Sequence, residues 1–298
     1  MYISYSGYDR LESCQKAYYL EYIGKATLGQ PENRVNMLYG DAVGKIFERF
    51  YRDEIWRANT TARLMGLVRP TIKRIIAKET EKGGVFNWDD PTLKEGTRSL
   101  EQVIAEVEAT IPRAMLSIRH HGLIGLDAQA ELVLDVDVGG HRIGGRADFV
   151  MTRAQTKDLV LIDGKGSRHR DKYTNHRQLR WYSMLYAMRS GVVPDKLGFL
   201  YWRSEPAESM DWSTTTREEL RELRRAVLET LRGLEEKVKQ IDAGAEPMQL
   251  FPPTPGFGCK FCKFLHQCTE GQKVLSADFK QQRATDRKRG VEEGDVGF

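Results

Sequence analysis

The chain has 298 residues, of which 40% are hydrophobic and 30% charged, an ordinary balance for a protein that buries a sizeable core. Its 46 basic and 42 acidic residues nearly cancel, so the net charge of +4 excludes a strongly charged chain and only mildly favours a polyanionic partner. No stretch approaches about eighteen consecutive apolar residues, and the opening MYISYSGYDRLESC lacks the pattern of a signal peptide. These features predict a cytoplasmic protein without a membrane partner.

Helical periodicity dominates the first 120 residues. It predicts a short helix over residues 4–23 with Ser6 as its N-cap, and further helices over 35–55, 60–82 and 97–119. The stretch GGVFNWDDPTLKEGT carries turn residues, so we expect a loop between the last two helices.

The pattern changes at about residue 128. AELVLDVDVGGHRIGGRADFVM alternates apolar and polar residues around Gly139-Gly140 and predicts a hairpin, and DLVLIDGKG predicts a buried strand. RQLRWYSMLYAM returns to helical period, KLGFLYWRS predicts another strand, and residues 220–241 predict a long amphipathic helix. We therefore expect an α/β domain with a mixed central sheet flanked by helices.

Two segments depart from this core. The helical patterns at about 56–120 precede the sheet and are expected to form a helical insertion. Residues 275–298 are charged and poor in apolar residues, so we expect a flexible tail.

Three of the four cysteines lie in GCKFCKFLHQC, as Cys259, Cys262 and Cys268, with the spacing of metal ligands. Cys14 lies far away, on the aromatic-rich helix predicted near the N-terminus. In a reducing compartment a disulfide framework is not expected, so the cluster of cysteines favours a bound metal or an iron-sulfur group. Which residue completes such a site is left open by the spacing.

Two carboxylates and an amine are predicted to meet at the sheet. Asp163 and Lys165 are two residues apart on one strand, so their side chains leave the same face. Asp148 ends the preceding strand, and antiparallel pairing through the loop 152–158 would bring it beside Asp163. Two oxygen ligands with open coordination positions suit Mg²⁺ or Mn²⁺ bound to substrate phosphate, with Lys165 assisting the attacking water.

Two further groups follow this strand. Gln178 and Tyr182 lie at i and i+4 of the next helix and could hold a phosphate or orient Lys165. The stretch GSRHRDKYTNHRQLRWY mixes cations with aromatic rings, a combination suited to single-stranded DNA. The residues expected to contact DNA are Arg168, Arg170, Lys172, Arg177 and Trp181.

The segments GGRADFV, LIDGKGS and QLRWY resemble successive motifs of the PD-(D/E)XK nucleases of the RecB type, whose pattern runs G-x-x-x-H, G-x-x-D, (D/E)-x-K and Q-x-x-x-Y. The resemblance covers roughly residues 1–270. It is greatest with the iron-sulfur members, found among AddB-type helicase-nuclease subunits and a CRISPR-associated exonuclease. In those proteins one cysteine near the N-terminus joins a C-terminal C-x2-C-x5-C.

The resemblance implies a restriction-endonuclease-like core in a single nuclease domain over residues 1–274. It also implies a 4Fe-4S cluster held by Cys14, Cys259, Cys262 and Cys268, in an iron-sulfur lobe made from residues 1–25 and 250–270. Structural zinc is the alternative, since four thiolates also satisfy tetrahedral Zn²⁺. One cysteine plus three, rather than two close pairs, favours the cluster.

This sequence departs from the family at its first motif. In YGDAVGKIFERF, Gly40 takes the place of the glycine and Gly44 the place of the metal-binding histidine. Glu48, one turn further along the same helix, is our candidate replacement as a metal ligand, with Asp41 and His141 as weaker substitutes.

The function predicted from these features is metal-dependent hydrolysis of DNA, most simply by an exonuclease that acts on single-stranded ends. The predicted catalytic residues are Asp148, Asp163, Lys165, Gln178 and Tyr182. A nuclease-like DNA-binding or assembly subunit without catalysis is the alternative, and a zinc-stapled RNA-binding protein is a third. No G-x-x-x-x-G-K-[ST] motif is present, so unwinding would need a helicase or recombination partner. Repair, recombination, phage DNA processing and CRISPR spacer acquisition all employ such enzymes.

Overall fold

The computed structural model describes the chain over residues 1–28, 33–57, 60–90, 93, 99–125, 127–167 and 176–276. Most of the predicted DNA-binding loop and of the predicted tail, residues 168–175 and 277–298, lies outside these ranges.

The chain divides into two compact units. The first, which we call the sheet unit, comprises Met1–Tyr5 and Pro31–Arg232. The second, which we call the terminal unit, comprises Ser6–Gln30 and Gly233–Phe298, so it is built from segments near both ends of the sequence.

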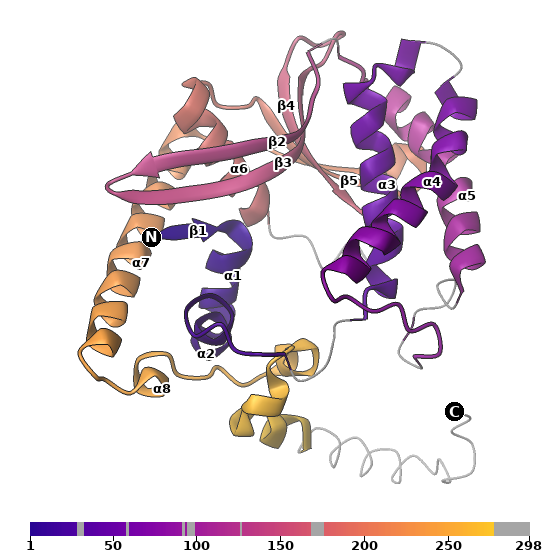
Figure 1. Ribbon diagram of the computed structural model, residues 1–298. Helices are drawn as coiled ribbons and strands as arrows, with labels where there is room; N and C mark the ends of the chain where they lie inside the picture. The colour runs from indigo at the N-terminus through magenta and orange to yellow at the C-terminus, as the bar shows by residue number, and fades with distance from the viewer. Residues whose placement is uncertain are drawn as a thin grey trace, which may run out of the picture. The chain divides into compact units, whose positions relative to one another are not determined.

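A six-stranded mixed sheet organises the sheet unit (Figure 1). Its order is β1-β3-β4-β5-β6, with β2 added on β3. The strands are β1 (Tyr2–Ser4), β2 (Gln129–Val138), β3 (His141–Thr152), β4 (Leu159–Lys165), β5 (Lys196–Tyr201) and β6 (Met210–Ser213). The β1–β3 and β4–β5 pairs are parallel and the others antiparallel. The predicted α/β class, the hairpin and the buried strand are therefore confirmed.

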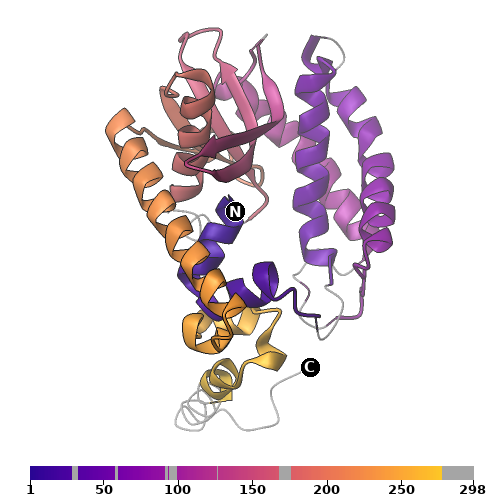
Figure 2. The ribbon, with the colours of Figure 1, turned by 60° about the vertical axis from the view of Figure 1, so that its left-hand side comes forward.

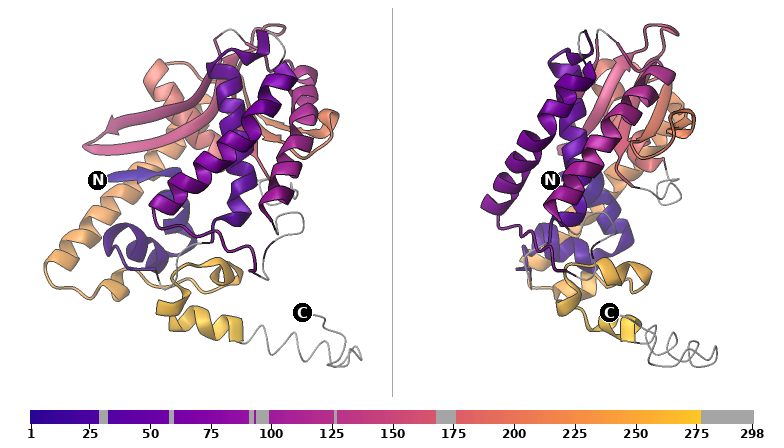
Figure 3. Two further views of the ribbon diagram at one scale, coloured as in Figure 1. Left: turned by 45° about the vertical axis from the view of Figure 1, so that its right-hand side comes forward. Right: turned by 90° about the vertical axis from the view of Figure 1, so that its right-hand side faces the viewer.

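Three helices pack together against one face of the sheet (Figure 3). They are α3 (Val35–Arg52), α4 (Thr60–Glu81) and α5 (Leu100–His120). Their buried apolar side chains share a core with Phe149, Ile162 and Leu200 from three neighbouring strands. This apolar burial is the main stabilising contribution to the sheet unit.

The alternation along β4 separates apolar from polar side chains. Val160 and Ile162 belong to the core with α3–α5. Asp163 and Lys165 occupy the alternate positions of the strand, so their side chains point to the opposite face of the sheet. Helix α6 (Arg177–Ser190) supplies the groups that these polar side chains meet. Helices α3–α5 therefore cover one face of the sheet mainly with apolar side chains, whereas α6 brings polar side chains to the other face.

The first 25 residues differ from the predicted single helix over 4–23. A short strand, β1, pairs in parallel with β3 through Tyr2 opposite Arg142, a tertiary contact that helical periodicity could not indicate. Helix α1 (Tyr5–Ser13) then stops at Cys14, which is extended at φ −162° and ψ 109°. A short helix, α2 (Gln15–Tyr18), and a π-helical turn (Tyr19–Ile23) follow.

The C-terminal part begins with α7 (Arg217–Asp242), the predicted long helix, which is prominent in Figure 2. It continues through α8 (Pro247–Leu250) into two 3-10 turns, Phe257–Phe261 and Leu265–Gln267. Among the described residues, no helix combines the length and apolar character needed to cross a bilayer.

Candidate active site

The register of β3 and β4 brings the two predicted carboxylates together. Phe149 pairs with Ile162, so the next position along each strand sets Asp148 opposite Asp163. The backbone N–H of Gly164 donates a hydrogen bond of 2.8 Å to Asp148 Oδ2. The antiparallel pairing expected through the loop 152–158 is thus present.

Lys165 and α6 complete a closed network around Asp163. Lys165 Nζ lies 2.6 Å from Asp163 Oδ2 and donates to Gln178 Oε1 at 2.7 Å. The amide nitrogen of Gln178 donates to Asp163 Oδ1 and to the Tyr182 hydroxyl, each at 3.0 Å. One amide therefore orients the acid, the amine and the phenol at once. The structure brings all the predicted catalytic residues into one place.

Burial sets the electrostatics of this site. Desolvation, with the neighbouring Asp163 charge, raises the pKa of Asp148 to about 8. Desolvation also raises the pKa of Asp163, although the Lys165 ammonium opposes this shift. Burial and the charge of Asp163 raise the pKa of Tyr182. The site therefore carries more negative charge than its own cation neutralises once both acids ionise.

A third carboxylate, Glu131 on β2, was not among the predicted residues. The pairs on either side of it in the hairpin place Glu131 opposite Asp148. Its φ of +53° interrupts the regular strand, and its charge contributes to the raised pKa of Asp148. Counting eight residues out from each side of the Gly139-Gly140 turn would have identified this position from the sequence.

Glu48, the predicted third ligand, is paired within its own helix. Its carboxylate pairs with Lys45 at 2.7 Å and with Arg52 at 2.8 Å, both on its own helix α3. Within the described ranges, no three His, Cys, Asp or Glu side chains converge closely enough to hold one ion. The structure brings the predicted ligands Asp148 and Asp163 together, and Glu48 as a third ligand stays a prediction.

The glycine at the histidine position of the first motif faces open space. A Cβ placed on Gly44 would meet no heavy atom within 4 Å. One turn earlier, Gly40 approaches Gly166, just beyond Lys165; one residue later, Lys45 pairs with Glu131 at 3.3 Å. These two contacts place the part of α3 around Gly44 close to Gly166, which follows Lys165, and to Glu131, which lies opposite Asp148.

The predicted DNA-binding residues differ in whether the structure describes them and in how far they are buried. Arg168, Arg170 and Lys172 lie outside the described residues. Arg177 begins α6 and is half-buried. Trp181 is only 1% exposed and donates its indole N–H to the carbonyl of Gly144 at 3.1 Å, so its predicted stacking on DNA bases is wrong.

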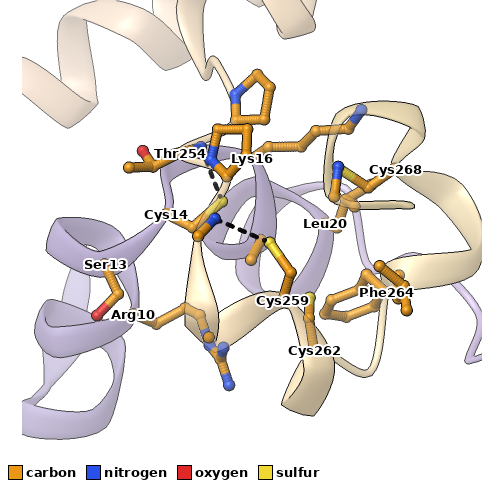
Figure 4. Close-up of a pocket in the computed structure, with 17 residues that line it drawn as sticks. Arg10, Ser13, Cys14, Lys16, Leu20, Thr254, Cys259, Cys262, Phe264 and Cys268 are labelled. Atoms are coloured by element: carbon orange, nitrogen blue, oxygen red, sulfur yellow. Dashed lines mark hydrogen bonds between the residues drawn. The ribbon is translucent and has the colours of Figure 1, made fainter. Parts of the chain in front are cut away.

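The four cysteines line one cavity of about 370 Å³ in the terminal unit (Figure 4). Cys14 is the extended residue between α1 and α2, whereas Cys259 lies in the first 3-10 turn and Cys262 and Cys268 directly follow the first and second turns. All four thiols are free. The structure thus gathers cysteines that are far apart in the sequence around a common space, although no three of these described thiols lie close enough together to hold one metal ion.

Backbone N–H groups and cations surround this cavity, although burial raises the pKa of the Cys268 thiol, which donates to Glu270. Three of the sulfurs accept backbone N–H bonds of 3.4 to 3.5 Å: Cys14 from Thr254, Cys259 from Gly256 and Cys268 from Gly271. Arg10 and Lys16 also line the cavity. Backbone donors and nearby cations both stabilise thiolates.

Comparisons with known proteins agree with the motifs. The family model of the PD-(D/E)XK nuclease superfamily matches residues 2–269. Among solved structures, a "Putative exonuclease" from Eubacterium rectale is 15% identical with a TM-score of 0.44, covering 78% of this chain and 79% of that one. SSO0001 is 17% identical with a TM-score of 0.28, covering 57% and 76%. None of the curated proteins matches this chain.

The aspartate pair predicts a pH-dependent stability. Groups whose pKa is raised by folding stabilise the folded state at low pH, and that contribution is lost as pH rises through the folded pKa, here about 8 for Asp148. In buffer without divalent cations, the free energy of unfolding should fall by at least about 1.4 kcal/mol between pH 5 and 8, the equivalent of one pKa unit.

Urea unfolding of the wild type and of Asp148→Asn at each pH measures this effect. The variant cannot ionise at position 148 and should show a flatter profile. Asp137→Asn, at an exposed carboxylate of the same hairpin, should keep the wild-type profile. Equal slopes for wild type and Asp148→Asn would contradict the assignment.

Proposed function

We propose that this chain hydrolyses DNA in a metal-dependent reaction and acts as an exonuclease on single-stranded ends. The chain belongs to the PD-(D/E)XK nuclease superfamily, and this membership makes it a nuclease. The observation that carries the proposal is the closed network of Asp163, Lys165, Gln178 and Tyr182 beside Asp148. A structural salt bridge would need only two of these groups. A network that converges on the buried Asp163, with a second carboxylate beside it, suits a reaction centre better.

The aspartate pair fits a divalent cation. Two adjacent carboxylates raise each other's proton affinity, and a bound Mg²⁺ or Mn²⁺ would relieve that repulsion while keeping positions for water and phosphate. When bound, such an ion supplies charge neutralisation at the scissile phosphate and acidifies water. Asp148 and Asp163 are the residues that would hold it.

The remaining residues position the reactants. Lys165, next to Asp163, carries the positive charge that would stabilise the attacking water and the negative charge that develops on phosphate oxygens. Gln178 fixes the direction of the Lys165 ammonium by accepting its hydrogen bond. Tyr182 is held by the same amide, and its raised pKa keeps the hydroxyl protonated as a donor.

The first test is cleavage of end-labelled single- and double-stranded DNA with Mn²⁺ or Mg²⁺. We expect single-stranded DNA to be shortened from an end, and Asp163→Asn, Asp148→Asn and Lys165→Met each to lose at least about 100-fold in rate, as expected when charge stabilisation is removed from a transition state.

Two control variants sharpen this test. Glu48→Gln should stay within a few-fold of wild type, because its carboxylate is engaged by Lys45 and Arg52. Asp137→Asn controls for loss of an exposed carboxylate. DNA binding without any cleavage by the wild type would instead favour the DNA-binding or assembly subunit.

The open space at Gly44 allows a gain of function. Gly44→His introduces the imidazole found at this motif position elsewhere in the family, and no neighbouring heavy atom obstructs its Cβ. We expect the variant to bind Mn²⁺ several-fold more tightly in isothermal titration calorimetry. Gly44→Ala is the matched control, because it fills the same space without a ligand and should leave the affinity unchanged. A Gly44→His variant with the affinity of the alanine control would contradict the placement of α3 beside the metal site.

We also propose that the four cysteines hold a 4Fe-4S cluster. The support is their shared cavity of about 370 Å³, the backbone N–H bonds to three sulfurs and the two cations in the lining. A cluster that joins Cys14 to the C-terminal turns would act as a cross-link within the terminal unit.

Anaerobically purified protein should absorb near about 400 nm, as expected for iron-thiolate clusters. Cys14→Ala should lose most of this absorption and lower the unfolding midpoint, since it removes a ligand and the cross-link between the two segments. Metal analysis distinguishes the cluster from structural zinc. About four iron atoms per chain would support the cluster, whereas one zinc atom and no visible absorption would indicate structural zinc instead.

A further inference from the structure

Two phenylalanines of the terminal unit are strongly exposed. Phe257 and Phe261 are each 72% exposed, more than any other large hydrophobic side chain in the described residues. Phe251 and Phe264, from the same part of the sequence, are 0% and 2% exposed. The exposure is therefore specific to the turn Phe257–Phe261 and is not a general property of the segment.

The two rings form an ordered pair with a lysine. Their centroids lie 5.9 Å apart at 66°, and both side chains project from one 3-10 turn. Lys260 Nζ lies 3.4 Å from the Phe257 centroid and 5.0 Å from that of Phe261. An ammonium in contact with both rings keeps the pair together at the surface.

The same turn carries Cys259, and Cys262 follows it directly. Both line the cysteine cavity, and their backbone N–H groups donate to the carbonyls of Gly256 and Cys259, which fixes the turn that presents the rings. Rigid presentation lowers the entropic cost of binding.

The surrounding charge identifies the chemistry of a ligand. No acidic residue occurs between 247 and 269; Lys263 is paired with Glu21 at 2.6 Å, whereas Lys260 lies against the two rings. Exposed aromatic faces beside cations suit a ligand that is both planar and anionic. A protein partner would need a wider apolar surface than two rings provide, since stable interfaces bury more than about 1,000 Å².

We propose that Phe257 and Phe261 form a stacking platform for unpaired bases of single-stranded DNA, with Lys260 contacting the adjacent phosphate. This proposal rests on the proposed function in that DNA is the substrate, and it adds a binding site in the terminal unit. The site has no sequence preference, because every base offers a face for stacking.

The test measures DNA binding without cleavage. In full-length Asp163→Asn protein, the affinity for a fluorescein-labelled 20-mer of thymidine is read by fluorescence anisotropy. Phe257→Ala/Phe261→Ala should weaken binding at least about tenfold, because two base-stacking contacts are lost. Phe257→Trp/Phe261→Trp should keep it, and Phe257→Leu/Phe261→Leu should not, because leucine retains apolar area without an aromatic face.

Two further variants serve as controls. Leu116→Ala removes another exposed apolar side chain, 54% exposed on α5, and should leave the affinity unchanged. Lys260→Gln should reduce the slope of log affinity against log salt by about 0.7, the value for one phosphate contact on a single strand.

Unchanged affinity in the double alanine variant would overturn the proposal. Full affinity in the leucine variant would also overturn it, because contact without stacking would suffice. If circular dichroism shows that the alanine variant is misfolded, photo-crosslinking of a 5-iodouracil oligonucleotide to the chain with its native rings decides. Crosslinks at Phe257 or Phe261 support the platform, and crosslinks only elsewhere overturn it. If the wild-type protein does not cleave DNA, the proposed function is wrong, but the binding result still stands.

Discussion

Two neighbouring carboxylates, the buried Asp163 and the half-buried Asp148, lie side by side on β4 and β3, and the placement of the site's other groups depends on keeping them there. Like charges in a poorly solvated position repel, which the raised pKa of Asp148 expresses. The strand register and the N–H of Gly164 hold the pair in place. The site therefore stores an electrostatic cost in the free protein that binding of a cation would recover.

The two faces of the sheet have different roles around this pair. The apolar core with α3–α5 stabilises the strands, while α6 presents Gln178 and Tyr182 to the site. Glu131, held by Lys45 and Arg146, adds a further charge from the edge strand. Substitutions in the helical core should thus act mainly through stability, and those on α6 through the geometry of the network.

Local patterns predicted much of this arrangement. Alternation around Gly139-Gly140 and the spacing of Asp163 and Lys165 were sufficient, because a hairpin register and a two-residue strand period are local properties. The pairing of β1 with β3 and the break at Cys14 were missed, since both depend on tertiary contacts. Trp181 was misassigned because an aromatic residue in a basic stretch has the same signature whether it is buried or exposed.

The terminal unit has a consequence for biosynthesis. About 245 residues separate Cys14 from Cys259, so at roughly 5–20 residues per second the first thiol emerges from the ribosome some tens of seconds before its partners are made. During that interval, α1 and α2 lack the segments on which they close, and Cys14 is accessible to oxidants or to other metals. The two segments of this unit can therefore close on each other only after the sheet unit has been synthesised.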